Sequence, residues 1–145
     1  MESAVVYGSQ FGNTRQIAEA IGRGLGPEAR VLEAASFSPS QLRRGSLLVV
    51  GSPIVGWKPL EGLGAWLDAL APGSLDGVRT AAFDTRVKLF IHGDAAKKIE
   101  RALEAAGAER AADPTWYYVE GTEGPLLKGE IERAEAWGRS LAGGQ

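Results

Sequence analysis

The sequence predicts a single domain, residues 1–145, of the α/β class: a three-layer sandwich around a five-stranded parallel sheet. Short apolar runs rich in valine and aromatic residues alternate with longer segments of helical period. This strict alternation places the strands in parallel, with helices on both faces of the sheet. The run SLLVVG at residues 46–51 is apolar on both faces, as a central strand covered on both sides should be.

Five segments have the composition of strands. They lie at residues 4–8, 30–33, 46–51, 79–83 and 116–119. The segment ASFSPSQLRRG between the second and third strands has room for one short helix or 3₁₀ turn. We expect the strand order 2-1-3-4-5, in which ligands bind at the carboxyl ends of the strands beside the switch between strands one and three.

Four helix candidates each carry an apolar stripe at helical spacing. They cover about residues 13–25, 60–70, 95–106 and 128–141. The stripes are Ile17, Ile21 and Leu25; Leu60, Leu63, Leu67 and Leu70; Ile99, Leu103 and Ala106; and Ile131, Ala134 and Leu141. Such a stripe lets each helix pack against one face of the sheet.

Composition excludes several classes of function. Sixteen basic and 18 acidic side chains give a net charge of −2, which argues against a nucleic-acid-binding protein. Cysteine is absent and histidine occurs once, so we expect neither disulfides nor a metal site built from these residues. We expect no membrane span and no signal peptide, and therefore a cytoplasmic protein. Any basic face should lie near residues 76–101, which hold six basic and four acidic groups.

Three loops at the carboxyl ends of the strands are the candidate binding site. The first, GSQFGN at residues 8–13, feeds the first helix, whose free amides and dipole favour an anion. Ser9, Asn13 and Thr14 add side-chain donors. The pattern fits a phosphate monoester, but neither the nucleotide P-loop nor the GxGxxG dinucleotide motif. The alternative is an ordinary strand-to-helix turn capped by Gly12 or Asn13.

The second loop, GSPIVGWKP at residues 51–59, carries a tryptophan. Trp57 on a loop at a binding edge is a candidate for stacking on a flat ring. Gly56 beside it lets the backbone reorient or approach a ring closely. The alternative is that Trp57 folds back as a lid on the core.

The third loop follows the fourth strand. Asp84 and Thr85 are placed to hydrogen-bond a ligand edge, and Arg86 and Lys88 to offset negative charge on a cofactor or to contact an acidic partner. The alternative is that Asp84 and Arg86 simply pair with each other or face water. We interpret His92 as a surface residue and not as a catalytic base.

These stretches resemble one known family nearly end to end. YGSQFGNTRQIAEAI at residues 7–21 resembles the phosphate-binding loop and first helix of flavodoxins and of the flavodoxin-like domains of diflavin reductases. VVGSPIVGWKPL at residues 49–60 looks like the second flavin loop of a subfamily that usually reads Gly-x-Pro-Thr-x-Gly-Phe-x-Pro. AAFDTR at 81–86 and WYYVEGTEGPLLKGEIERAEAW at 116–137 are similar to its fourth strand, fifth strand and last helix. The resemblance implies a flavodoxin-like fold of the short-chain form, with an unbroken fifth strand.

The resemblance also implies that FMN is bound without a covalent bond. By position, the cofactor-binding residues are Ser9, Gln10, Phe11, Gly12, Asn13 and Thr14 at the phosphate; Ser52, Pro53, Ile54, Val55, Gly56 and Trp57 on one side of the isoalloxazine; and Asp84, Thr85 and Arg86 on the other. One of the two peptides flanking Gly56 is expected near the flavin N5 atom. No catalytic side chain and no metal ligand are implied.

The sequence departs from the family pattern at three places. Phe11 stands where many relatives have threonine, and Ile54 replaces the usual threonine of the second loop. The third loop lacks the tyrosine that often stacks on the ring, and Phe90 is its nearest aromatic residue. The net charge of −2 is also mild beside the acidic surface usual for carrier flavodoxins.

We therefore expect an FMN-binding redox protein that carries electrons between partner proteins. One alternative is an FMN-dependent oxidoreductase acting on a quinone or another small ring system. A second alternative is a flavodoxin-fold module that no longer binds FMN and acts through a protein partner. The sequence does not indicate an oligomeric state.

Overall fold

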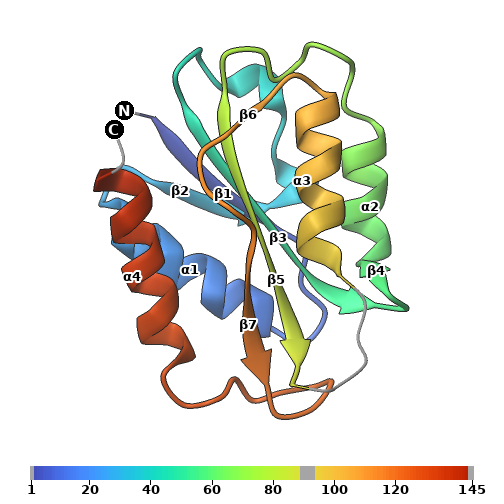
Figure 1. Ribbon diagram of the computed structural model, residues 1–145, viewed down its shortest axis with the longest axis vertical. Coiled ribbons are helices and arrows are strands. Elements are labelled where there is room, and N and C mark those ends of the chain that lie inside the picture. The colour runs from blue at the N-terminus through green and yellow to red at the C-terminus, as the bar shows by residue number, and fades with distance from the viewer. Residues whose placement is uncertain (1, 89–93, 144–145) are drawn as a thin grey trace.

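The three-layer architecture is confirmed by a computed structural model, which describes residues 2–88 and 94–143. Helices cover both faces of a central sheet (Figure 1). The strands are β1 (Ser3–Tyr7), β2 (Arg30–Glu33), β3 (Leu47–Val55), β4 (Lys58–Pro59), β5 (Arg79–Val87), β6 (Glu109–Arg110) and β7 (Thr115–Val119). The helices are α1 (Asn13–Leu25), α2 (Glu61–Asp68), α3 (Ala95–Ala105) and α4 (Glu130–Gly143), and the 3₁₀ turns η1 (Ala34–Ser36) and η2 (Pro39–Gln41) link β2 to β3.

The order of the long strands is the predicted one. The sheet runs β2-β1-β3-β5, with β7 on the outer edge of β5, and all these pairs are parallel. Two short strands are additions: β4 pairs antiparallel with the end of β3, and β6 pairs with the start of β5. The predicted order 2-1-3-4-5 is therefore confirmed.

The expectation of an unbroken fifth strand is wrong. Glu109 pairs with Arg79 and Thr115 pairs with Phe83, so the edge holds two more residues than β5 between these pairs. Pro114 lies in the interruption and has no N–H to donate to the ladder. The edge strand is thus split into β6 and β7.

Two strands extend further than the sequence pattern predicts. Ser52 to Val55 belong to β3, and Asp84 to Val87 belong to β5. These residues stay extended because β5 is paired on both sides: Ser52 pairs with Asp84, and Asp84 pairs with Trp116. Part of the predicted second and third loops is therefore sheet.

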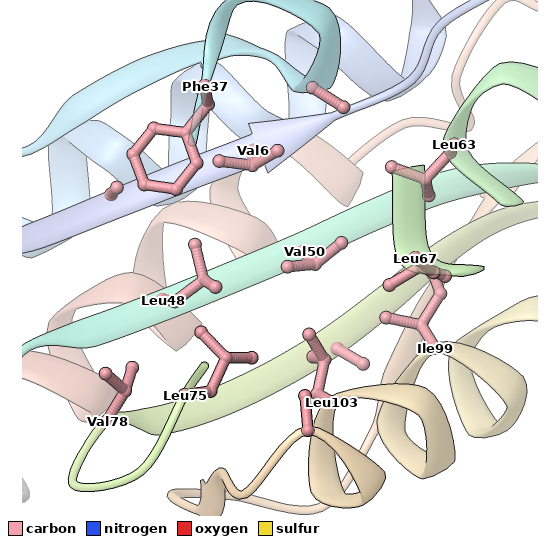
Figure 2. Close-up of a cluster of buried hydrophobic side chains, with 14 residues drawn as sticks. Val6, Phe37, Leu48, Val50, Leu63, Leu67, Leu75, Val78, Ile99 and Leu103 are labelled. Atoms are coloured by element: carbon pink, nitrogen blue, oxygen red, sulfur yellow. The ribbon is translucent and has the colours of Figure 1, made fainter. Parts of the chain in front are cut away.

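Alternate residues of the strands fill two cores. On one face, Val6, Leu48 and Val50 pack with Leu63 of α2 and Ile99 of α3, as Figure 2 shows. The opposite face is covered by α1 and α4, and its buried residues are Val5, Tyr7, Leu47, Val49, Ala81, Phe83, Ile17, Ile21, Tyr117, Ala134 and Leu141. Burial on both faces rigidly fixes the carboxyl edge of the sheet.

Helices α1 and α4 approach each other backbone to backbone. A Cβ atom built on Gly138 would lie 2.3 Å from the Ile21 carbonyl oxygen, and one on Gly24 would lie 2.1 Å from the Glu135 carbonyl oxygen. Glycine is required at both positions because any side chain would force the helices apart. Within the described residues, no helix combines the length and apolar character that crossing a bilayer demands.

Candidate functional site

A pocket of about 360 Å³ opens at the carboxyl edge of the sheet. It lies among the start of α1, the end of β3 with its hairpin, and the ends of β5 and β7. Eleven predicted residues line it: Gln10, Phe11, Asn13, Thr14, Pro53, Ile54, Val55, Gly56, Trp57, Thr85 and Arg86. The predicted residues Ser9, Gly12, Ser52 and Asp84 do not line it. The structure thus brings all three predicted segments together, while their contacts with FMN stay a prediction.

The start of α1 is open to a ligand. Gly12 is the N-cap with φ of 91°, and no side chain caps the helix. Ser9 has a different role from the predicted one, since its Oγ accepts a 3.0 Å hydrogen bond from the Gly12 amide and so shapes the turn. The first amides of a helix have no acceptor within it, and the dipole adds positive potential there. This end of α1 therefore suits an anionic group.

Two buried hydroxyls join α1 to β5 beneath this end. The Oγ1 atoms of Thr14 and Thr85 lie 2.7 Å apart, and both residues are buried. Only one of the two hydroxyls donates in this contact, so the proton of the other remains available to a ligand. The contact also fixes the first turn of α1 against the sheet.

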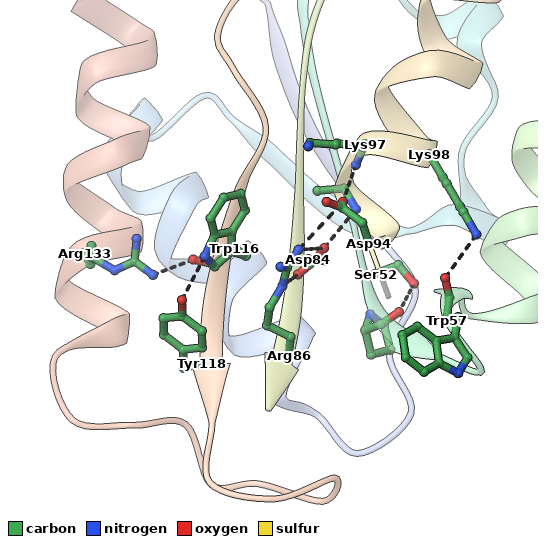
Figure 3. A network of polar contacts seen from close by, with 12 residues as sticks. Ser52, Trp57, Asp84, Arg86, Asp94, Lys97, Lys98, Trp116, Tyr118 and Arg133 are labelled. Atoms are coloured by element: carbon green, nitrogen blue, oxygen red, sulfur yellow. Dashed lines mark hydrogen bonds and ion pairs between the residues drawn. The ribbon is translucent and has the colours of Figure 1, made fainter. Parts of the chain in front are cut away.

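Trp57 stands at the tip of the β3–β4 hairpin. Gly56 (φ 57°) and Trp57 (φ 70°) form its two-residue turn, in which both residues have positive φ as a type I′ turn requires. Trp57 is 56% exposed, so the alternative of a lid on the core is wrong. Its backbone oxygen accepts a 3.1 Å hydrogen bond from Lys98 Nζ on α3, shown in Figure 3.

Ser52 fixes the base of this hairpin. It is fully buried, and its Oγ accepts a 2.8 Å bond from the Leu60 amide and donates a 2.8 Å bond to the Pro53 carbonyl. With both contacts made inside the protein, Ser52 holds the second segment in shape rather than lining the pocket. The structure therefore places Ser52 beneath the pocket lining and not in contact with the pocket.

Asp84 and Arg86 form a buried ion pair on the α3 side of the sheet. The two guanidinium contacts are 2.8 Å (Nε to Oδ1) and 2.6 Å (NH2 to Oδ2), and the Ala96 amide donates to Asp84 Oδ2 at 2.9 Å (Figure 3). Burial raises the pKa of Asp84, although Arg86 and the Ala96 amide act in the opposite direction. The Arg86 guanidinium also lies 4.5 Å from the centre of the Trp116 ring.

This pairing changes the expected roles of both residues. The alternative that they pair is confirmed, but they do so inside the protein and not in water. Asp84 is fully buried and turned from the pocket, and the charge of Arg86 is matched by Asp84. Arg86 therefore has little charge left to offset that of a cofactor. Lys88, the other predicted cation, lies over the Tyr118 ring at 5.4 Å.

Three lining residues were missed: Val87, Val119 and Thr122. Val119 and Thr122 come from the end of β7 and the loop after it, which share the carboxyl edge with β3 and β5. The predicted strand order contained this signal, because the fifth strand ends at the same edge as the fourth. Phe90, the nearest aromatic residue of the third loop, and His92, interpreted as a surface residue, lie outside the described residues.

The comparisons with known proteins agree with this geometry. The flavodoxin family model matches residues 5–137. The chain belongs to the flavodoxin family. None of the curated proteins compared with the chain matches it significantly.

Several solved structures share the fold of this chain across its whole length. A flavodoxin from the domain Archaea is 22% identical, with a TM-score of 0.78 over 99% of this chain and 97% of that one. Flavodoxin 1 from Bacillus cereus is 17% identical, with a TM-score of 0.81 over 99% and 98%. The flavodiiron protein from Giardia intestinalis is 21% identical, with a TM-score of 0.75, but the match covers 36% of that longer chain and 99% of this one.

FMN is the cofactor of the flavodoxin family, and the residues present fit it. The uncapped start of α1 suits the phosphate, and the apolar wall with exposed Trp57 suits a flat ring. When bound, FMN supplies one-electron and two-electron redox chemistry. The described residues contain no cluster of side chains suited to a metal ion.

Proposed function

We propose that this protein is an electron carrier that exchanges electrons with partner proteins through FMN held in the pocket. The supporting observation is the lack of acid–base groups: among the described residues that line the pocket, Arg86 is the one ionisable side chain. Its charge is matched by buried Asp84. A proton donor within hydrogen-bond reach of the substrate speeds the reduction of a quinone, typically by about 10²–10⁴-fold. A carrier needs none.

The side chains around the pocket have three tasks in this proposal. The amides at the start of α1 and the hydroxyls of Thr14 and Thr85 bind polar parts of the cofactor. Trp57 stacks on the ring, and the aliphatic residues Ile54, Val55, Val87 and Val119 exclude water from it. A dry wall strengthens the interactions that set reduction potentials. The role of the peptides at Gly56 stays a prediction.

The experiment is reconstitution with FMN followed by a reductive titration. We expect one FMN per chain, released on denaturation, and two separated one-electron potentials. Rapid two-electron reduction by NAD(P)H with quinone turnover would instead favour the oxidoreductase. A colourless protein that does not titrate with FMN would contradict both and favour the module that acts through a protein partner.

The stacking role of Trp57 has its own test. Trp57→Leu keeps an apolar side chain but removes the ring face, and we expect FMN to bind about 2–10-fold more weakly, equivalent to about 0.5–1.5 kcal/mol. The side chain is largely exposed, so the free energy of unfolding of the apoprotein should change little. Equal FMN affinity in the two proteins would contradict the stacking role.

A further inference from the structure

Four of the five lysines of the chain lie near the pocket mouth: Lys58, Lys97 and Lys98 at the hairpin and α3, and Lys88 over the Tyr118 ring of β7. Lys58 follows Trp57 in the hairpin, and Lys88 follows the pocket-lining Val87. Lys98 reaches the backbone of Trp57 from the first turns of α3, where Lys97 is its neighbour (Figure 3). We call Lys58, Lys88, Lys97 and Lys98 the basic sector.

The basic sector is exposed and carries no ion pairs. All four side chains are exposed, and within residues 2–88 and 94–143 none of them forms a salt bridge. Every salt bridge in that part of the chain uses an arginine instead. The charges of the basic sector are therefore available to something outside the chain.

An apolar rim adjoins the basic sector. Among the described residues, the large hydrophobic side chains that are exposed are Phe11 (46%), Val55 (36%) and Trp57 (56%). All three line the pocket. An apolar centre with a charged border is the usual anatomy of a protein–protein interface. Three such side chains at one opening mark a contact surface, which the bound FMN ring and a docked partner would share.

We propose that this surface docks a redox protein whose own contact surface is acidic. The inference rests on the carrier function proposed above and adds the chemistry of the partner. Attraction between the basic sector and carboxylates would steer the encounter, and the apolar rim would hold the complex. The net charge of −2 predicts the opposite, weak repulsion of an acidic partner, so local and overall charge make different predictions.

Two exposed acidic residues near the mouth follow β7. Glu120 and Glu123 are exposed in the loop after β7, which contributes Thr122 to the pocket. Two carboxylates lie beside the basic sector itself: Glu61 is exposed at the start of α2, and Asp94, the N-cap of α3, pairs with Arg86. A partner with its own carboxylates is therefore drawn toward the hairpin and α3, and repelled from the loop after β7.

A first test needs no cofactor. The fluorescence of the apoprotein is quenched with iodide and, separately, with caesium. The signal of Trp57 is obtained by subtracting that of the Trp57→Phe variant, and each quenching constant is divided by the one measured for a free tryptophan amide. We expect iodide to quench more than caesium at low salt, by about 2-fold or more, and the difference to vanish at high salt. Stronger quenching by caesium would overturn the proposal whether or not FMN binds.

The matched variants change the same charge at opposite ends of the sheet. Lys58→Glu/Lys97→Glu alters the basic sector, and neither side chain has a described partner. The control variant is Arg43→Glu/Arg44→Glu. These two residues precede β3 at the far end of the sheet, and neither guanidinium forms a described ion pair. We expect the first pair to reverse the iodide preference and the second to leave it unchanged. Equal effects would show that net charge, not the basic sector, decides.

A second test uses electron transfer from the reduced, FMN-loaded protein. Each ferricyanide trianion accepts one electron, and its bimolecular rate should fall as ionic strength rises. Lys58→Glu/Lys97→Glu should lower this rate about 10-fold at low salt, and Arg43→Glu/Arg44→Glu by less than about 2-fold. A rate that rises with ionic strength would overturn the acidic partner alone. If the reductive titration shows a single two-electron step instead of two separate one-electron potentials, while the iodide result is as expected, the carrier function alone is overturned.

Discussion

Lys98 on α3 holds the backbone of Trp57 in the β3–β4 hairpin through a 3.1 Å hydrogen bond from its Nζ to the Trp57 carbonyl oxygen. Trp57 has φ of 70°, a conformation that a bulky side chain adopts only at a cost in free energy. The bond from α3 offsets part of that cost. It also sets the position of the ring that we propose stacks on the flavin.

Lys98→Met should loosen the hairpin. Removal of one hydrogen bond of this kind costs about 0.5–1.5 kcal/mol, so we expect FMN to dissociate about 2–10-fold faster. Near-ultraviolet circular dichroism of the apoprotein should show a weaker Trp57 signal. Lys97→Met removes the same charge from the neighbouring position and is the control. Identical dissociation rates in the two variants would show that charge matters and the hydrogen bond does not.

Asp84→Asn should destabilise the whole domain. The change removes the carboxylate that balances Arg86 inside the protein, and breaking such a buried pair costs about 3–5 kcal/mol. Urea unfolding of the apoprotein measures the loss. Asp113→Asn is the control, since its ion pair with Arg110 is exposed and should contribute less than about 1 kcal/mol. A loss for Asp84→Asn as small as that of the control would contradict the energetic role of the buried pair.

The carboxyl group of Glu130 should make the free energy of unfolding decrease at acid pH. Burial by itself would raise the pKa of this carboxyl, but hydrogen bonds from Arg133 and the Tyr118 amide, with the nearby charge of Lys88, lower it overall. The folded protein therefore favours the carboxylate. The contribution of the carboxylate to the free energy of unfolding is complete above pH 4.5, the ordinary pKa of the group in the unfolded chain. It is lost as the pH falls through the lower pKa that the group has in the folded protein.

Glu130→Gln should thus cost about 1.5–3 kcal/mol at pH 7, the range for hydrogen bonds to a charged group. The difference from the unchanged protein should shrink below about pH 4, as measured by urea unfolding at each pH. Glu132→Gln, at an exposed position in the same turn, should cost little at either pH. A difference that stays constant with pH would show that the ionised form of Glu130 is not what the fold uses.

Two glycine-to-alanine changes should have opposite signs. Gly138→Ala places a methyl group 2.3 Å from the Ile21 carbonyl oxygen, so α1 and α4 must separate, at a cost of about 1–3 kcal/mol. Gly64→Ala in α2 meets open space and should stabilise by about 0.4–1 kcal/mol because alanine favours the helix. Thermal unfolding distinguishes the two, and a neutral Gly138→Ala would show that the helices are less tightly packed than described.

The sequence by itself determined the strand order, the identity of the three segments at the carboxyl edge and most of the pocket lining. These features follow from local patterns: apolar periodicity marks each element, and the end of a parallel strand marks the binding edge. Eleven of the predicted residues meet at the pocket for this reason.

Only the tertiary structure decided what individual polar side chains do. Ser52 and Asp84 follow apolar strand residues as pocket residues do, yet they face inward because both strands continue: Ser52 pairs with Asp84, and Asp84 also pairs with Trp116. Which face a residue takes depends on register with neighbouring strands, and a local pattern does not contain that register. The same reason explains the basic sector: Lys58 and Lys98 are forty positions apart, and the packing of α3 beside the hairpin brings them together.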